Sequence, residues 1–230
     1  MAERDPGAPV RDRPSLPHDS ALLHVTGAAR YVDDVAEPPG MLHLAFGQSA
    51  EAHGRIAAMD LSAVRAAPGV VAVYTAADIP GVNDVSPVAA DDRLMADGTV
   101  IHVGQPLFLV AATSHLAARK AARLGAITYD PLPPVITIEQ AEAVGSMIEP
   151  EQRMARGDAP AALASAPHRL TGRFAMGGQD HFYLEGQIAV ATPQEQGQMH
   201  VLSSTQHPSE VQHLVAKVLG LTHADVTVEV

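Results

Sequence analysis

The sequence predicts an α+β fold, and three observations support this. Hydrophobic residues make up 47% of the 230 residues and charged residues 18%, a balance typical of a chain with a buried core. Apolar residues alternate over some segments, as in strands, and recur every three to four positions over others, as in helices. A strand–helix–strand order over residues 107–129 indicates an α/β or α+β module over roughly residues 18–140.

Composition excludes several classes of function. The chain has 15 Lys and Arg against 26 Asp and Glu, a net charge of -11, so nucleic acid and anionic membrane surfaces would repel it. It has no cysteine, which excludes disulfides, thiolate metal ligands and any iron–sulfur cluster held by its own thiolates. No apolar stretch approaches the roughly 20 residues of a membrane span, and no secretory signal is visible. We therefore expect a cytoplasmic protein.

The first elements follow from local patterns. Four prolines interrupt residues 1–17, which we expect to form a flexible tail. In the segment Met41–Phe46, the side chains of Leu42, Leu44 and Phe46 alternate with smaller or polar ones. This alternation predicts a strand with these three apolar side chains on its buried face.

A helix, a strand and a long loop come next. The sequence predicts a short helix over Leu61–Ala67, with Asp60 as its N-cap, and then a strand over Val70–Tyr74. Residues 78–97 are rich in proline, aspartate and asparagine and show no periodicity. We expect them to form a loop that is either a surface excursion or a contact with a partner.

The strand–helix–strand segment follows this loop. The apolar run Leu107–Ala112 predicts a strand that is covered on both faces. Ser114 is placed to cap a helix over His115–Leu124, and a strand over Ala126–Tyr129 completes the order.

The second part of the chain begins with a short helix. Asp158 is its predicted N-cap, and the helix covers Ala159–Ser165. Three strands are expected after it, over Arg169–Met176, His181–Ala191 and Met199–Ser204. Apolar residues within Val211–Leu219 recur at helical spacing, which predicts an amphipathic helix that begins at Pro208 and ends at Gly220.

Gln206 lies where the predicted strand Met199–Ser204 leads into this helix. If the last residues, Ala224–Val230, pair parallel to that strand, the unit is β–α–β, and ligands bind beyond the carboxyl ends of such strands. Unpaired N–H groups at the helix start would favour an anion, and the Gln206 amide adds a neutral donor or acceptor. In the alternative interpretation, Gln206 or Thr205 is a helix cap or a polar filler between loops. The residues leave both interpretations open.

Other motifs for chemistry are missing from the sequence. The 12 histidines show no metal-ligand spacing, and His181 beside Asp180 is better explained as a hydrogen-bonded structural residue. No phosphate-binding glycine loop and no G-x-S-x-G motif occur. Glu210, near the start of the last helix, is explained by the helix dipole. We therefore predict no metal ligand and no catalytic residue within this chain.

Five segments of the chain carry a resemblance to a known family. They are residues 24–56 (HVTGAARYVDDVAEPPGMLHLAFGQSAEAHGRI), 60–81, 103–141, 156–193 and 203–221 (SSTQHPSEVQHLVAKVLGL). In this order, they resemble the molybdenum-binding subunit of xanthine dehydrogenases and related molybdenum hydroxylases. The resemblance implies an α/β hammerhead domain over residues 18–148. It implies the beginning of a molybdopterin-binding domain, in truncated form, over residues 149–230.

The resemblance also gives Gln206 a role, because the family's glutamine at this position points its amide at an oxygen ligand of molybdenum. The family's most recognisable motif is interpreted here as structural; its members are Gly177, Gly178, Gln179, His181, Phe182, Tyr183 and Glu185. The family's G-G-G-F-G-G-K-E segment, its substrate-binding residues and its catalytic base come later and are absent before Val230.

For function, the resemblance implies oxidative hydroxylation of a purine, xanthine or hypoxanthine to urate, by a complete enzyme. The molybdenum–molybdopterin cofactor would be shared with sequence beyond residue 230. Iron–sulfur clusters and FAD would lie on a partner subunit of a hetero-oligomer, and would pass electrons to NAD. The alternatives are a non-catalytic subunit-docking role and a hydroxylase that acts on an aldehyde or another N-heterocycle.

The resemblance further implies that apolar surfaces at the end of the sequence lack covering layers. These are the strand Val226–Val230 and the helix face within Val211–Leu219. We therefore expect the 230-residue polypeptide alone to aggregate, or to keep only its first domain folded.

Overall fold

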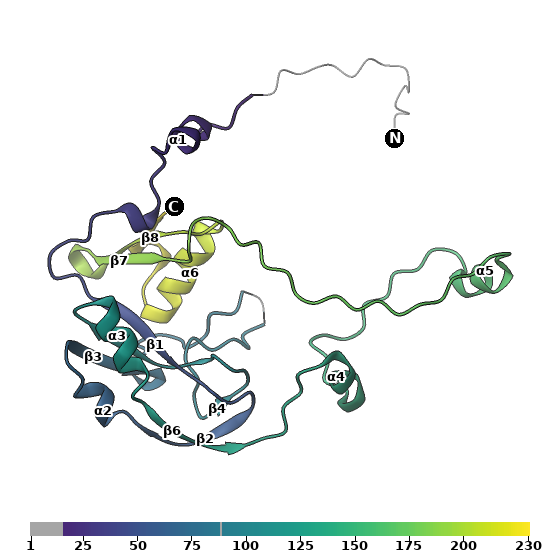
Figure 1. The fold of residues 1–230 in the computed structure, drawn as a ribbon, viewed down its shortest axis with the longest axis horizontal. Helices are drawn as coiled ribbons and strands as arrows, with labels where there is room; N and C mark the ends of the chain where they lie inside the picture. Colours follow the sequence, from purple (N-terminus) through teal and green to yellow (C-terminus); the bar gives the residue numbers. More distant parts are fainter. Residues whose placement is uncertain (1–15, 88) are drawn as a thin grey trace.

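The computed structural model describes residues 16–87 and 89–230, so the flexible tail predicted for residues 1–17 lies almost wholly outside the described residues. Within the described part, the chain forms two units joined by a long arm (Figure 1). The first unit holds two three-stranded sheets, and the second holds a third three-stranded sheet with one helix packed against it.

The first unit is an antiparallel α+β structure. Its strands are β1 (His43–Gln48), β2 (Gly54–Asp60), β3 (Val70–Thr75), β4 (Thr99–Val100), β5 (Pro106–Ala112) and β6 (Ala126–Pro131). Its helical segments are α2 (Ser62–Arg65), η2 (Ala76–Asp78) and α3 (His115–Ala122). The helix α1 (Ala21–Thr26) and the 3-10 turn η1 (Val32–Asp34) precede this unit on an N-terminal extension (Figure 1). The sheets have the orders β1-β5-β3 and β4-β2-β6, with every pair antiparallel. Although α3 connects β5 to β6, these strands belong to different sheets, so the unit is α+β and not a parallel α/β crossover.

Strand β5 is the centre of its sheet and is buried on both faces, as predicted. Leu107 is 0% exposed and its neighbour Phe108, on the other face, is 1% exposed. Phe108 belongs to a core cluster that includes Val64 of α2 and Ala118 of α3. The two helices and the sheet therefore share one hydrophobic core.

The prediction of the buried face of β1 is wrong. Leu42, Leu44 and Phe46 are 43%, 57% and 42% exposed, whereas Gly47 on the opposite face is buried. Helix α3 packs on the Gly47 face, and the Phe108 ring lies where a side chain at position 47 would stand. No side chain fits under the ring at position 47, and the large apolar side chains point to the other face of the sheet.

The helix caps mostly follow the sequence. In α3, the Ser114 hydroxyl accepts a hydrogen bond from the Ala117 N–H (3.2 Å), as predicted. Helix α2 is a single turn with Leu61 at its N-cap, one residue later than expected. The Asp60 carboxylate still accepts the Ser62 N–H (2.9 Å), and this bond lowers the pKa of Asp60 below its usual value.

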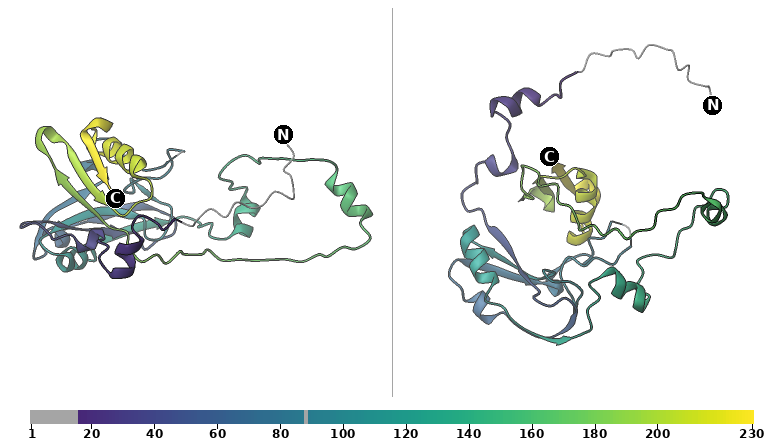
Figure 2. Two further views of the ribbon diagram at one scale, coloured as in Figure 1. Left: turned by 90° about the horizontal axis from the view of Figure 1, so that it is seen from above. Right: turned by 45° about the vertical axis from the view of Figure 1, so that its right-hand side comes forward.

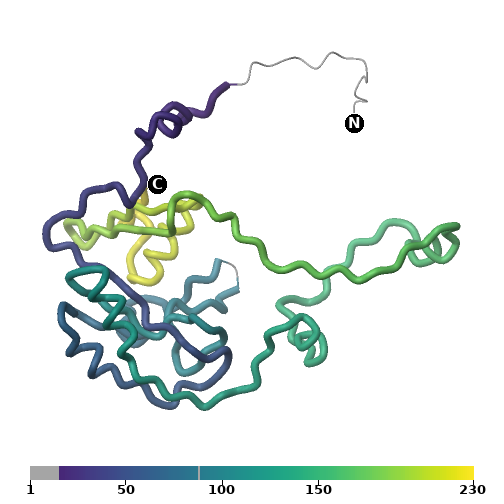
Figure 3. The backbone as a smooth tube through the Cα atoms, in the orientation of Figure 1, coloured from purple at the N-terminus to yellow at the C-terminus, as the bar shows by residue number. Residues whose placement is uncertain are grey.

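The arm runs between the two units and carries two short helices. These are α4 (Ile138–Val144), which the sequence patterns do not predict, and α5 (Ala159–Ser165), which has its predicted bounds; neither has a buried residue. The Asp158 side chain caps α5 by accepting the Ala161 N–H (2.9 Å). Figures 2 and 3 show the arm extending away from both units and then returning.

Two predicted strands of the second part are wrong or shortened. Arg169–Met176 is extended but unpaired, and only the end of His181–Ala191 forms a strand, β7 (Ala189–Pro193). Phe174 is 86% exposed. Among the described residues, none runs beside this segment to supply the backbone hydrogen bonds that a strand requires.

The predicted β–α–β unit is confirmed. In the second unit, β7 pairs antiparallel with β8 (Met199–Ser203), and β8 pairs parallel with β9 (Val226–Glu229). The crossover consists of α6 (Pro208–Leu219), which ends at Gly220 in the left-handed conformation (φ 69°), and the 3-10 turn η4 (His223–Asp225). Another 3-10 turn, η3 (Glu195–Gly197), joins β7 to β8. No helix in residues 16–87 or 89–230 is long and apolar enough to cross a membrane.

Candidate functional site

The turn that carries Gln206 joins the carboxyl end of β8 to the start of α6. Hydrogen bonds hold this turn on both sides of Gln206. The Ser204 hydroxyl accepts the Ile188 N–H (3.0 Å) and donates to the Gly186 carbonyl (2.8 Å). The Thr205 hydroxyl accepts the His207 N–H (3.0 Å). The position of Gln206 is therefore fixed by its neighbours and not by its own side chain.

The Gln206 side chain is exposed and has no hydrogen-bond partner among the described residues. Helix α6 has His207 at its N-cap, and no side chain caps it. The structure thus does not use Gln206 as a helix cap, and the Thr205 hydroxyl binds a residue before the helix. The Gln206 amide remains available to a group outside the protein.

The start of α6 offers fewer donors to an anion than the sequence led us to expect. Pro208 has no N–H, and the N–H groups of Glu210 and Val211 both donate to the His207 carbonyl (3.1 and 3.2 Å). The Glu210 carboxylate also lies in the first turn, where its negative charge would repel an anion. The Gln206 amide is therefore one of several exposed polar groups at this turn, beside the side chains of His207 and Ser209.

A direct metal site is not formed by the described residues. In residues 16–87 and 89–230, no group of three or more His, Asp or Glu side chains is placed to hold a metal ion. The rings of His213 and His223 stack with their centres 4.0 Å apart. They line a pocket of about 500 Å³ between α6 and the loop at Ser86 and Pro87.

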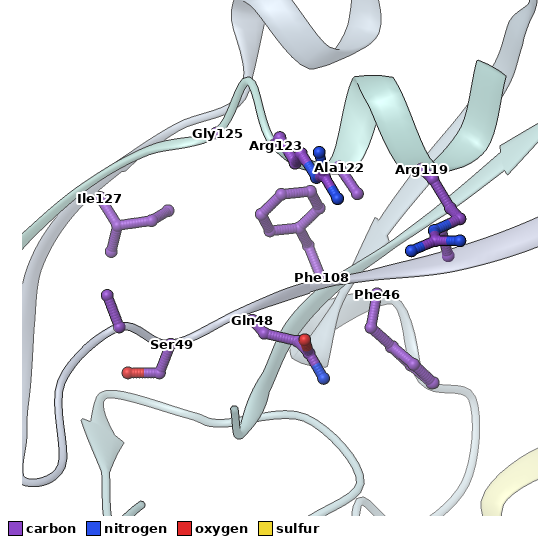
Figure 4. Close-up of a pocket in the computed structure, with 11 residues that line it drawn as sticks. Phe46, Gln48, Ser49, Phe108, Arg119, Ala122, Arg123, Gly125 and Ile127 are labelled. Atoms are coloured by element: carbon purple, nitrogen blue, oxygen red, sulfur yellow. The ribbon is translucent and has the colours of Figure 1, made fainter. Parts of the chain in front are cut away.

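A second pocket, of about 480 Å³, lies in the first unit and does not contain Gln206 (Figure 4). Arg119 of α3 and Arg123, at the C-cap of this helix, lie on one side of the Phe108 ring, and Gln48 lies on the other. No carboxylate, histidine or cysteine lines this pocket. The Ser49 hydroxyl in its lining is hydrogen-bonded to the Glu51 backbone (3.0 Å) and has no carboxylate or histidine beside it to act as a base, so the pocket does not form a candidate active site.

The recognisable motif before β7 makes a structural contact. The Glu185 carboxylate accepts the Val32 N–H (3.0 Å), which ties η1 to the start of the second unit. Around Gly177 and Gly178 there is open space, so no close approach explains these two glycines.

Two protein-family models match the chain. Residues 26–133 match the a/b hammerhead domain of aldehyde oxidase and xanthine dehydrogenase, and residues 141–230 match the molybdopterin cofactor-binding domain.

Curated relatives match over most of this chain. A xanthine dehydrogenase of Drosophila subobscura is 42% identical over 212 residues, which are 91% of this chain and 16% of the relative. A xanthine dehydrogenase of Oryza sativa is 38% identical over 91% of this chain and 16% of its own length. Aldehyde oxidase 4 of Mus musculus is 37% identical over 94% of this chain and, again, 16% of its own length. The chain thus spans about one sixth of the length of these relatives.

Solved structures agree with the sequence matches. The aldehyde oxidoreductase of Desulfovibrio gigas has a TM-score of 0.77 and 27% identity, with 92% of this chain and 26% of that chain covered. Quinoline 2-oxidoreductase of Pseudomonas putida has a TM-score of 0.75 and 29% identity, with 93% and 29% covered. The chain therefore belongs to the xanthine dehydrogenase and aldehyde oxidase family of molybdenum enzymes, with a hammerhead domain followed by molybdopterin cofactor-binding sequence.

Proposed function

We propose that the chain forms the N-terminal part of the molybdenum-binding subunit of a cytoplasmic xanthine dehydrogenase. The complete enzyme would oxidise hypoxanthine and xanthine to urate and pass electrons to iron–sulfur clusters, FAD and NAD on a partner subunit. The names of the curated relatives support this substrate. The observation that carries the molybdenum chemistry is the exposed Gln206 amide at the carboxyl end of β8, within sequence that matches a molybdopterin-binding domain.

The residues present fit a molybdenum–molybdopterin group that brings its own metal ligands. The described part of the chain has no side-chain cluster for a bare metal ion, but it offers one neutral amide at the end of a parallel β–α–β unit. When bound, the group supplies the oxygen-transfer and two-electron redox chemistry. In the hammerhead and in this unit, Gln206 is the residue that we propose to contact it.

Gln206 would act by holding a hydrogen bond in place. Its amide can donate to or accept from an oxygen without adding a charge. The bonds of Ser204 and Thr205 fix the backbone of the turn, so only the Gln206 side chain has to be ordered when the cofactor binds. Once ordered against the cofactor, a neutral donor stabilises charge that develops on an oxygen during the reaction.

The test of this role is Gln206→Ala in the complete enzyme. We expect the rate of xanthine oxidation to fall roughly 10- to 100-fold, because a partner of the metal's ligands is lost. Molybdenum content per subunit should stay nearly unchanged, since the pterin contacts lie elsewhere. The control is Gln198→Ala, which removes an exposed glutamine side chain in the same unit. Wild-type turnover of the Gln206→Ala enzyme would contradict the role.

The substrate and the full subunit need a separate test. Sequencing the native gene past codon 230 should show a continuing frame with a glycine-rich G-G-x-F-G-G-K-E segment. The enzyme encoded by that gene and its partner should then oxidise xanthine faster than an aldehyde or quinoline. Preference for either of the other two substrates would keep the enzyme class and correct the substrate.

A second candidate role, docking of the partner subunit by the hammerhead, is favoured by the open face of the β1-β5-β3 sheet. Leu44, Phe46 and Tyr74 are 57%, 42% and 45% exposed, and an apolar face of this kind is typical of an interface. Phe46→Ser should weaken co-purification of the iron–sulfur and FAD subunit. Leu116→Ser, on an exposed position of α3, is the control. Equal recovery of the partner with both variants would argue against docking here.

A further inference from the structure

The loop between η2 and β4 reaches from the hammerhead to the C-terminal end of α6. The Gly81 N–H donates to the Val218 carbonyl (2.9 Å), and the Val82 N–H donates to the Lys217 carbonyl (3.0 Å). The last four carbonyls of a helix have no partner within the helix. The loop therefore satisfies two carbonyl groups that α6 would otherwise leave open.

Gly81 stands where no side chain fits. A Cβ atom at this position would lie 2.6 Å from the Gly220 nitrogen and 2.8 Å from the Val218 carbonyl oxygen. Such short contacts are sterically excluded, so the loop and the helix approach this closely only with glycine here.

A partly buried ion pair joins the same two elements. Lys217 of α6 donates to one oxygen of Asp84, and the hydroxyl and N–H of Ser86 donate to the other. Asp84 is only 8% exposed. The hydrogen bonds from Lys217 and Ser86 lower the pKa of Asp84 to about 2, so the carboxylate stays charged and the pair stays intact near neutral pH.

The loop is itself anchored in the hammerhead. The Asn83 side chain donates to the Met95 carbonyl (2.7 Å) and accepts the Met95 N–H (3.0 Å). Met95 is 3% exposed, and the N–H of the next residue, Ala96, donates to the Pro106 carbonyl at the start of β5 (2.8 Å). A continuous chain of contacts therefore runs from the central hammerhead strand to Lys217.

Helix α6 links this contact to Gln206. Twelve residues at about 1.5 Å per residue make a rod of about 18 Å, with the loop contact at its C-terminal end and the Gln206 turn at its N-terminal end. The helix is also tied to β9, because the Gln212 side chain donates to the Val226 carbonyl (2.7 Å). A rigid helix that is held at one end has a defined position at the other.

We propose that the segment Gly81–Ser86 of the hammerhead is a positioning element for Gln206, and that Asp84 and Lys217 are its positioning residues. The hammerhead thereby takes part in aligning the molybdenum site through α6. This inference rests on the role proposed above for Gln206. A purely stabilising contact would change only the stability of the fold. A positioning contact should change kcat as well, and this change should depend on the presence of Gln206.

The experiment compares variants of the complete enzyme. Asp84→Asn keeps the shape of the side chain but removes its charge. We expect kcat for xanthine to fall about 3- to 10-fold, with KM within about twofold and an unchanged molybdenum content. The electron paramagnetic resonance signal of the molybdenum should shift, and hydrogen exchange at the start of α6 should quicken even without cofactor.

Three further variants test whether the effect depends on the ion pair between Asp84 and Lys217. Lys217→Met should repeat the effect, and Lys217→Arg should restore most of kcat because it keeps the charge. Glu139→Gln breaks the exposed pair between Arg173 and Glu139 on the arm and should leave kcat unchanged. Wild-type kcat, resonance signal and hydrogen exchange in Asp84→Asn would overturn the inference.

A double-mutant cycle decides whether the effect passes through Gln206. In the Gln206→Ala enzyme, Asp84→Asn should cause little further loss, because the group that it positions is already gone. Equal losses in both backgrounds would overturn the inference and leave the proposed function intact. If Gln206→Ala itself has wild-type kcat and signal, the proposed role of Gln206 fails instead.

Discussion

At the scale of single residues, Asp84 combines burial with a full set of hydrogen bonds. A buried carboxylate is costly unless donors surround it, and here Ser86 and Lys217 provide them. Nothing in the sequence distinguishes Asp84 from the other acidic residues of its loop. Its role follows only from its contact with a lysine 133 positions later in the chain.

The lowered pKa of Asp84 predicts a stability difference that depends on pH. The pKa of this carboxyl is about 2 in the folded protein, against an ordinary value of 3.8, so the ionised carboxylate stabilises the fold fully above about pH 4. This stabilisation is lost as the pH falls from about 4 towards 2. We therefore expect the Tm of the wild type to exceed that of Asp84→Asn at about pH 6, and the two values to converge near pH 2. A difference in Tm that stays constant over this range would contradict the assignment.

At the scale of elements, the packing of α3 on β1 depends on glycine. The Phe108 ring fills the space above Gly47, and a Cβ at Gly125 would lie 2.8 Å from the same ring. Two glycines therefore border one large core side chain. This explains why the face of β1 that carries Ala45 and Gly47, and not the face with Leu44 and Phe46, is turned to the helix.

Gly47→Ala should therefore destabilise the hammerhead. The added methyl group overlaps the Phe108 ring, and overpacking of this kind costs about 1–3 kcal/mol. Urea unfolding followed by circular dichroism measures the change. Gly172→Ala is the matched control, because nothing lies within 4 Å of its Cβ, and it should change the free energy of unfolding by less than about 0.5 kcal/mol. Equal stability of the two variants would show that the ring moves aside without cost.

At the scale of the whole molecule, the arm between the two units carries large apolar side chains that are almost fully exposed to solvent. Met154, Leu170 and Phe174 are 100%, 103% and 86% exposed, and the arm has no sheet contacts among the described residues. The two units touch instead through the loop at Gly81 and the end of α6. The contact between this loop and α6 thus holds the two units together, whereas the arm that connects them along the chain extends away from both (Figure 3).

Limited proteolysis should detect this difference. We expect trypsin to cut first after Arg153, Arg156 or Arg169, which lie on the extended arm, and to leave a resistant hammerhead. Lys120 and Arg123 are also exposed, but α3 is packed on the sheet and should be cut later. Mass spectrometry of the early fragments identifies the sites. A single resistant piece of all 230 residues, or first cuts in α3, would contradict this order.

The sequence alone determined what depends on neighbours along the chain. The caps at Ser114 and Asp158, the glycine that ends α6, and the succession of β8, α6 and β9 along the chain all follow from residues a few positions apart. The same local order placed Gln206 at the end of a strand, although its role stays a prediction. The sequence also establishes which family the chain belongs to, because two family models match it in order over most of its length.

Only the tertiary structure decided what depends on distant partners. Alternation in β1 defines two faces, but α3 and the Phe108 ring decide which face is buried. A β-like pattern over 169–176 forms no strand where no neighbouring strand among the described residues supplies hydrogen bonds. The sequence of the loop at residues 78–97 does not indicate which element it contacts. Its partner is the end of α6, which lies more than 100 residues away in the chain. Local propensity fixes helices and turns, whereas burial, pairing and the contact between the two units are properties of surfaces that meet only in the folded chain.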